Sequence, residues 1–195
     1  MKFKKIYIEI TNVCNFHCSF CFPAIRAKNF MSVNDFQFVV ETVKSLTNYV
    51  YLHVLGEPLL HPQFNDILKV CNEAGLQVNL STNGSLLRKQ RNTLNQYSVR
   101  QLNISLHDAE ENIPESQWES FIETTLQISE ELASETYINL RLWNQTHEAS
   151  DRFNQLCYTV LRKHFHLPDA YQFAVKGARN VTLSSNIFLQ SAPPF

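Results

Sequence analysis

The sequence is poor in glycine and in charge, and it has no long apolar run. Only 4 of its 195 residues are glycine, and its acidic and basic residues nearly balance, for a formal net charge of −1. A chain this close to neutral has no broad basic surface for a polyanion, so we expect no nucleic-acid partner. No stretch of roughly 18 consecutive apolar residues occurs, so we expect no membrane partner either.

The amino terminus also lacks the pattern of a signal peptide. Residues 1–5 are basic, but only a short half-polar stretch separates them from a group of cysteines. Apolar residues make up 44% of the chain and aromatic residues 12%, which is typical of a globular domain rather than a disordered one. We therefore expect one cytoplasmic domain, with its core over residues 1–190 and a tail over 191–195.

Three of the five cysteines crowd into one short stretch. Cys14, Cys18 and Cys21 have the spacing C-x3-C-x2-C, directly after a strand-like run. An odd number of cysteines, three of them crowded together, predicts metal ligands in a reducing compartment rather than disulfides. Thiolate sulfur suits iron–sulfur clusters, zinc or copper(I). Three ligands leave one coordination position open, whereas a closed zinc site needs four.

Two other interpretations of these cysteines stay open. His17 would complete a zinc knuckle, although it lies one residue before Cys18, where the loop would be tight, and no second C-x-x-C or H-x-x-x-H pair exists. The three cysteines could also be purely structural. The remaining two, Cys71 and Cys157, fall on the apolar faces of predicted helices, and we interpret both as core residues.

Strand-like and helix-like stretches alternate along the chain. The residue patterns predict strands over 4–10, 49–55, 76–80, 101–106 and 136–142, helices over 32–46, 62–74, 86–94, 114–132 and 150–161, and a weaker sixth strand within 181–189 that is kinked at 184–185. Helix ends are predicted from caps at Ser32, Gly75 and Ser150 and from Pro62 in a first helical turn. This alternation predicts right-handed crossovers between parallel strands. The expected fold is α/β, a partial (β/α)5-6 TIM-like barrel.

Polar residues follow the predicted strands. The second strand ends in Gly56-Glu57-Pro58, the third in Ser81-Thr82-Asn83-Gly84, the fourth in Ser105 with His107, and the fifth in Arg141. The carboxyl ends of parallel strands meet at one edge of a sheet, where the chemistry of such folds is built. We expect these stretches to converge with the cysteines at one mouth.

Each of these stretches also has an ordinary structural explanation. The glycine–acid pair is a common turn, the Ser-Thr-Asn stretch is a common helix cap, and Arg141 could form a salt bridge. His107 is more often a loop histidine than a catalytic base, and packing explains His53, Trp118 and Trp143. The combination of stretches, rather than any one of them, favours a site.

The cysteine loop resembles that of the radical S-adenosylmethionine (SAM) superfamily. The family pattern C-x3-C-x-aromatic-C is matched with Phe20 as the aromatic residue, and Gly-Glu-Pro-Leu-Leu-His-Pro at 56–62 is found in a large branch of the family. Leu55 departs from the pattern, because many members have a second glycine there. The resemblance implies a [4Fe-4S] cluster on Cys14, Cys18 and Cys21, with SAM on the open iron. No cysteine follows Cys157, so we expect the auxiliary-cluster domain of many relatives to be missing.

The same resemblance implies which residues meet SAM. The implied contacts are Gly56, Glu57 and Pro58 at its amino group, Ser81, Thr82 and Asn83 as hydrogen-bond partners, Ser105 at the ribose, Arg141 at the carboxylate, and Phe20 and Phe22 at the adenine. The Arg141 assignment is chemically sensible, because guanidinium binds carboxylate with two parallel hydrogen bonds.

The resemblance also implies the activity. Electrons from a flavodoxin- or ferredoxin-like reductase would cleave SAM to a 5′-deoxyadenosyl radical that abstracts a hydrogen atom, so no side chain is expected to act as acid or base. An incomplete barrel favours a bulky substrate, either a peptide or a protein such as a glycyl-radical enzyme. The alternative is a truncated or degenerate core that binds the cluster and SAM but needs a partner for activity.

Overall fold

The structure, a computed structural model, describes residues 2–22, 25–97, 99–144, 151–173 and 180–191. The elements along the chain are β1 (Ile6–Tyr7), α1 (Val33–Val43), β2 (Tyr49–Tyr51), η1 (Pro58–Leu60), α2 (Phe64–Glu73), β3 (Gln77–Thr82), α3 (Leu87–Gln96), β4 (Gln101–Ser105), α4 (Asp108–Asn112), η2 (Glu115–Gln117), α5 (Trp118–Leu132), β5 (Tyr137–Leu142), α6 (Asp151–His164), β6 (Asn180–Ser184) and β7 (Ile187–Ser191). None of the helices in these ranges is long and apolar enough to cross a membrane.

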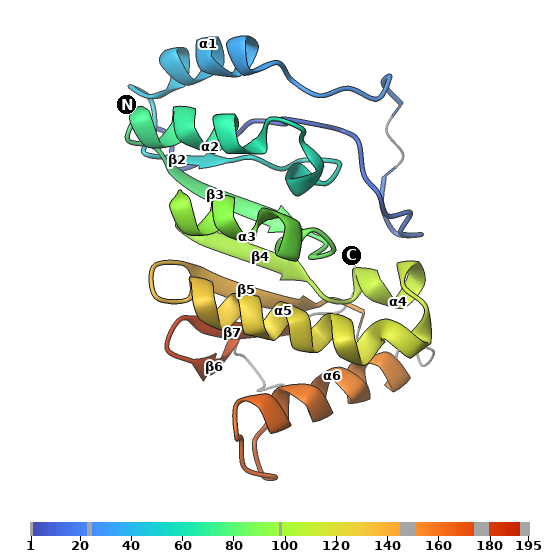
Figure 1. Cartoon of the computed structure of the whole chain (residues 1–195). Coiled ribbons are helices and arrows are strands. Elements are labelled where there is room, and N and C mark those ends of the chain that lie inside the picture. The colour runs from blue at the N-terminus through green and yellow to red at the C-terminus, as the bar shows by residue number, and fades with distance from the viewer. Residues whose placement is uncertain (1, 23–24, 98, 145–150, 174–179, 192–195) are drawn as a thin grey trace.

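The strands form one sheet in the order β1-β2-β3-β4-β5-β7-β6 (Figure 1). Every pairing from β1 to β5 is parallel, and β7 pairs with β5 in parallel as well. Helices α2, α3 and α5 lie in front of the sheet in Figure 1. Helix α1 packs beside α2, and α5 packs beside both α3 and α6. The predicted α/β class, with helices connecting parallel strands, is confirmed.

The last predicted strand is wrong in one respect. The expected kink at 184–185 is a reversal, because β6 runs antiparallel to β7. Ser184, Ser185 and Asn186 are turn-forming residues, and the Asn186 side chain donates a hydrogen bond of 2.7 Å to the Ala133 carbonyl, which holds the turn against the body of the protein. Ser191, which we assigned to the tail, closes β7, and residues 192–195 lie outside the described residues.

The helix boundaries follow the predicted caps, except at the start of α2 and at two short helices that were not predicted. Ser32 caps α1 by accepting a hydrogen bond from the Asp35 amide, and Gly75 follows α2 with a φ of +69°. Helix α2 begins at Phe64, so Pro62, which we placed in its first turn, lies before the Gln63 cap. The predicted cap Ser150 lies outside the described residues. Helices α4 and η2 have no counterpart in the sequence prediction.

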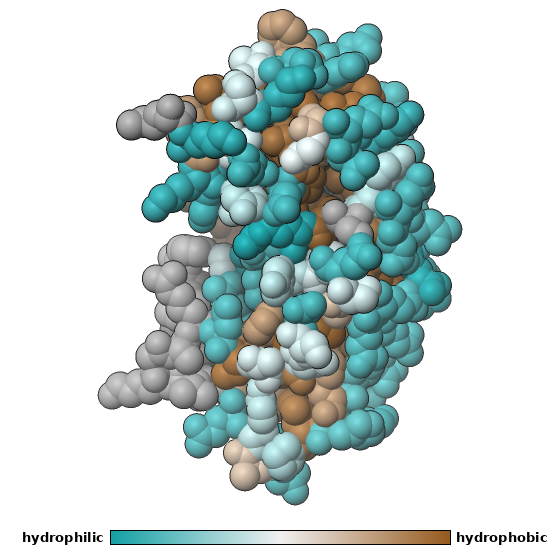
Figure 2. Space-filling view, turned by 90° about the vertical axis from the view of Figure 1, so that its left-hand side faces the viewer, coloured by the Kyte–Doolittle hydropathy of each residue, from teal (hydrophilic) through white to brown (hydrophobic). Residues whose placement is uncertain are grey.

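The core lies between the sheet and the helices. Apolar side chains on one face of the strands are buried against apolar side chains of α2 and α5, for example Leu80 and Leu140 on strands and Ile67 and Leu126 on helices. Burying each such side chain stabilises the fold by roughly 1.5–3 kcal/mol. Figure 2 views the molecule from the left of Figure 1 and shows hydrophobic residues down the middle, with hydrophilic residues over the right-hand side. Cys71 and Cys157 are fully buried in this core, as predicted.

The opposite face of the sheet is polar. Asn79, Asn103 and Asn139 alternate with the core residues of β3, β4 and β5, so they point away from the helices. The Asn103 side chain donates to the Leu80 carbonyl at 2.8 Å and accepts from the Asn139 amide at 3.2 Å. Side-chain amides thus link three neighbouring strands on the face that leads to the carboxyl edge of the sheet.

Candidate functional site

The carboxyl ends of the strands border a cavity of about 390 Å³. Its lining includes all three clustered cysteines and most of the predicted SAM-contacting residues, namely Cys14, Cys18, Cys21, Phe20, Phe22, Gly56, Glu57, Ser81, Thr82, Asn83 and Ser105. Two predicted residues do not line it: Pro58 is buried at the start of η1, and Arg141 lies behind Ser81. The structure therefore brings most of the predicted site together in one place.

The three cysteines are free thiols on the cavity wall. Burial raises the pKa of all three, to about 12 for Cys18, where the neighbouring Asp108 carboxylate adds repulsion. A metal cation reverses this balance, because it binds and stabilises the thiolate form. The donor set is therefore suited to a soft, positively charged metal centre placed in the cavity.

The described residues contain no group of three or more His, Cys, Asp or Glu side chains gathered around a single metal ion. The zinc knuckle with His17 therefore finds no support in the described part of the chain. In an iron–sulfur cluster each cysteine binds a different iron atom, so the sulfurs stand apart around the cluster. All three free thiols line one cavity, as this second arrangement requires.

Gly56 lies where the chain leaving β2 touches the entry to the cysteine loop. Its φ is +74°, and a Cβ atom there would lie 2.8 Å from the carbonyl oxygens of both Thr11 and Val13. The next amide, of Glu57, donates a hydrogen bond of 2.8 Å to the Val13 carbonyl. The close approach that requires a glycine here is to the protein's own backbone, and the implied contact of Gly56 with the amino group of SAM stays a prediction.

Glu57 joins the end of β2 to the end of β3. Its side chain is only 1% exposed, and its carboxylate accepts hydrogen bonds from the Thr82 hydroxyl at 2.8 Å, the Leu59 amide at 2.9 Å and the Asn83 amide at 2.8 Å. Burial raises the Glu57 pKa to about 7, although the three hydrogen bonds lower it. A buried carboxylate with three donors is a structural anchor, and contact with an amino group stays a prediction.

Asn83 extends this anchor to the first cysteine. Its side-chain nitrogen donates to the side-chain oxygen of Asn15 at 3.1 Å and lies 3.8 Å from the Cys14 sulfur. Its side-chain oxygen accepts from the Ser85 amide at 3.0 Å, which fixes the amide orientation. The Cys14 end of the loop is therefore positioned by a continuous chain of bonds from Glu57 through Asn83.

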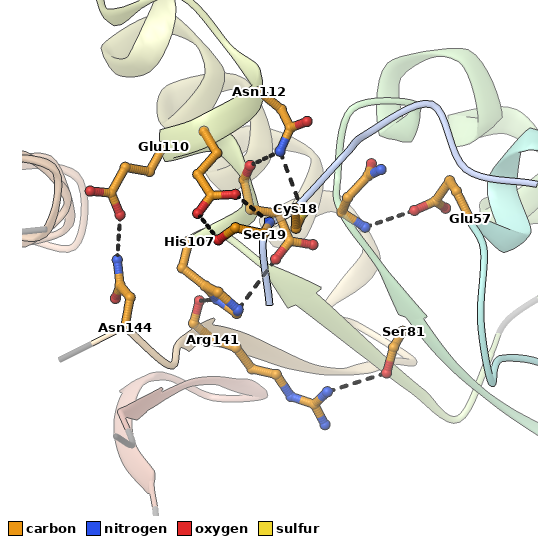
Figure 3. A network of polar contacts seen from close by, with 12 residues as sticks. Cys18, Ser19, Glu57, Ser81, His107, Glu110, Asn112, Arg141 and Asn144 are labelled. Carbon is orange, nitrogen blue, oxygen red and sulfur yellow. Dashed lines mark hydrogen bonds and ion pairs between the residues drawn. The ribbon is translucent and has the colours of Figure 1, made fainter. Parts of the chain in front are cut away.

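Ser81 and Arg141 meet at the rim of the cavity (Figure 3). The Arg141 guanidinium donates to the Ser81 hydroxyl at 3.3 Å and to the Gln190 side chain at 3.2 Å, and it lies 4.5 Å from the centre of the Trp143 ring. Burial lowers the Arg141 pKa to about 10, so the group stays charged at neutral pH. Ser105 lies beside Arg141 in the register of β4 and β5.

His53, which we assigned to packing, is also part of the cavity wall. Its ring packs edge-on against Tyr7 and Tyr51, and its Nε2 lies 3.2 Å from the Ser81 hydroxyl. Burial and the nearby Arg141 charge lower the His53 pKa to about 4, so the ring is neutral at physiological pH. Its place at the end of β2 was the available signal, which the packing interpretation overlooked.

The sequence analysis missed helix α4 and the groups that it carries. His107 precedes this helix, is buried, and places its ring 5.4 Å from that of Phe20. Asp108 lines the cavity, and burial with the nearby Glu57 and Glu111 charges raises its pKa to about 7. The acidic run Asp-Ala-Glu-Glu-Asn after the fourth strand was the signal, because acids in a first helical turn favour helix formation.

The comparison with protein families identifies the class of protein. The model of the radical SAM superfamily matches residues 8–139, from just after β1 to the middle of β5. The chain belongs to the radical SAM superfamily. Members of this family are enzymes that bind a [4Fe-4S] cluster and SAM.

Particular relatives cover the same region. The chain is 31% identical over 107 residues to a probable GTP 3′,8-cyclase of Pyrobaculum aerophilum, covering 53% of this chain and 34% of the relative. It is 26% identical over 110 residues to the GTP 3′,8-cyclase of a Synechocystis species, covering 54% of this chain and 34% of that protein. The chain thus spans about a third of the length of these relatives.

Solved structures share the fold. SuiB of Streptococcus suis bound to S-adenosylmethionine has a TM-score of 0.57 at 18% identity, over 80% of this chain and 38% of that one. BtrN in complex with AdoMet and 2-DOIA has a TM-score of 0.57 at 19% identity, over 72% of this chain and 58% of that one. These likenesses establish the partial-barrel architecture of this chain.

Proposed function

We propose that this chain holds a [4Fe-4S] cluster through Cys14, Cys18 and Cys21 and binds SAM beside it, as an enzyme that abstracts hydrogen from a substrate. When bound, the cluster and SAM supply the one-electron reductive cleavage and the radical chemistry. The observation that carries the proposal is the placement of three free thiols on the wall of one cavity, next to polar groups from four strand ends.

The chain's own residues would bind and orient SAM. Phe20 and Phe22 are 55% and 84% exposed beside the cysteines, which supports stacking of the adenine on an aromatic ring. Ser81 and Ser105 present hydroxyls at the strand ends, and the charged Arg141 behind Ser81 supports recognition of a carboxylate. Glu57, Thr82 and Asn83 would act by holding the wall in place, since their contacts are mostly with one another.

A polar substrate fits the remaining surface. The sheet face beyond the cavity carries side-chain amides, among them the partly exposed Gln101 of β4 and Asn139 of β5. A peptide offers both donors and acceptors to such groups. The solved structure of SuiB bound to the precursor peptide SuiA gives further support to a peptide or protein substrate. We also propose a cytoplasmic setting with a flavodoxin- or ferredoxin-like reductase.

The test is anaerobic reconstitution with iron and sulfide, followed by electron paramagnetic resonance after dithionite reduction, with and without SAM. We expect a cluster spectrum that changes when SAM is added, and formation of 5′-deoxyadenosine. Cys18→Ala should lose both, whereas Cys71→Ala, which removes a thiol from the core, should keep both.

Two results would go against the proposal. An unchanged cluster in Cys18→Ala would contradict the assigned ligands. A wild-type cluster that binds SAM but never cleaves it would favour the alternative, a core that needs a partner for activity.

A further inference from the structure

The cysteine loop has a second set of contacts at its other end, made by helix α4. The Glu111 carboxylate accepts hydrogen bonds from the Ser19 amide at 2.7 Å and from the Ser19 hydroxyl at 2.6 Å. The Asn112 side-chain oxygen accepts from the His17 amide at 2.6 Å. These bonds join segments more than 90 residues apart, on both sides of Cys18. Figure 3 shows the bonds to Ser19 and Cys18.

Asn112 also reaches the cysteine itself. Its side-chain nitrogen lies 3.4 Å from the Cys18 sulfur as a donor and donates to the Asp108 carbonyl at 2.8 Å. The orientation of this amide follows from its partners, because the His17 amide requires an oxygen at one position and the Asp108 carbonyl requires a nitrogen at the other. The N–H group of Asn112 is therefore directed at the sulfur.

We propose that Glu111 and Asn112 are positioning residues that hold the Cys18 end of the loop, and that the Asn112 amide tunes the iron bound there. This inference rests on the proposed function. A hydrogen bond to a ligating sulfur withdraws negative charge and stabilises the more negative, reduced cluster, so it raises the reduction potential.

The same helix offers a matched control. Glu110 directs its carboxylate away from the cysteine loop and accepts a hydrogen bond of 2.9 Å from Asn144, just beyond β5 (Figure 3). Glu110→Ala and Glu111→Ala therefore remove the same charge and the same side chain from adjacent positions of one helix. Only the second change removes bonds to the loop.

The anchoring is tested on the metal-free chain. Hydrogen–deuterium exchange of the His17 and Ser19 amides, followed by mass spectrometry of the peptides, reports how often the loop opens, since both amides donate to α4. We expect Glu111→Ala and Asn112→Ala to accelerate this exchange about threefold to tenfold, from the loss of hydrogen bonds that tie the loop to α4. Glu110→Ala should leave the rate unchanged. Equal rates in all four proteins would overturn the anchoring.

The tuning is tested on the reconstituted protein by potentiometric titration with dithionite as the one-electron reductant. At a fixed potential, we expect Asn112→Ala to lower the ratio of reduced to oxidised cluster up to about tenfold, which corresponds to ~59 mV for one electron. Glu110→Ala should match the wild type. An unchanged ratio in Asn112→Ala with a full cluster would overturn the tuning, which a merely structural role does not predict.

The two measurements separate this inference from the proposed function. A wild type that assembles no [4Fe-4S] cluster would overturn the proposed function, and the redox effect with it. The exchange rates of the His17 and Ser19 amides in the metal-free chain still decide whether α4 anchors the loop. A normal cluster together with unchanged rates and potentials would overturn the inference alone.

Discussion

Two carboxylates hold the cysteine loop, and their surroundings differ. Glu57 is buried and accepts three hydrogen bonds that join two strand ends, whereas Glu111 is exposed and accepts two, both from Ser19. Removing a buried acceptor leaves donors without any partner, while water replaces an exposed one. The Cys14 end of the loop therefore depends on the folded sheet, and the Cys18 end depends on a surface helix.

The largest loss of stability is expected at Gly56, which packs against the backbone beside the buried Glu57. Gly56→Ala would place a Cβ atom 2.8 Å from two backbone carbonyl oxygens at a φ of +74°, and neither strand end can retreat without losing its own bonds. We expect the free energy of unfolding to fall by at least ~3 kcal/mol, measured by urea denaturation.

Gly75→Ala is the control for that change. Gly75 has a similar φ of +69° but no atom within 4 Å of the added Cβ, so only the backbone strain remains. That strain amounts to about 1 kcal/mol. Equal losses in the two variants would show that the contact between residue 56 and the loop entry is unimportant.

Glu57→Gln should have the next largest effect, and the effect should depend on pH. The glutamine NH2 group cannot accept the Asn83 hydrogen bond, so at pH 5 we expect a loss of about 2 kcal/mol. Burial raises the Glu57 pKa from 4.5 to about 7, so the folded protein keeps its proton after the unfolded chain has released it.

The stability that this proton contributes is complete below pH 4.5 and is lost as the pH rises to about 7. The advantage of the wild type over Glu57→Gln should therefore fall by up to roughly 3 kcal/mol in that interval, which is enough to cancel it. Urea denaturation at several pH values would show it. A difference that is constant from pH 4 to pH 8 would contradict the buried, raised carboxyl.

The smallest effect is expected on the exposed side. Glu111→Ala should change the free energy of unfolding by less than ~1 kcal/mol, because its bonds to Ser19 are open to water. Glu110→Ala should change the free energy of unfolding equally little, with thermal denaturation as the measurement for both variants. A loss as large as that of Glu57→Gln would mean that α4 is part of the folding core, and the contrast between the two ends would disappear.

The strand ends were predictable because their signals are local. Glycine, acid and turn residues mark where Tyr49–Tyr51 and Gln77–Thr82 give way to the mouth, and parallel strands bring their carboxyl ends to one edge. The α4 contacts were not predictable, because the acidic run at 108–112 indicates a short helix but does not say which segment its side chains contact. Their partners lie more than 90 residues earlier, and no spacing rule connects the two segments.

The reversal between β6 and β7 and the role of Gly56 could not be predicted from the sequence either. Ser184 and Ser185 permit either a kink or a turn, and the turn forms because β7 completes hydrogen bonds along the open edge of β5. Local residue chemistry was enough to predict the cysteines as metal ligands, the alternating strands and helices, and the polar strand ends. Only packing between distant segments decided which backbone Gly56 touches, where Glu57 is buried and what holds Cys18, because such contacts depend on three-dimensional proximity and leave no period in the chain.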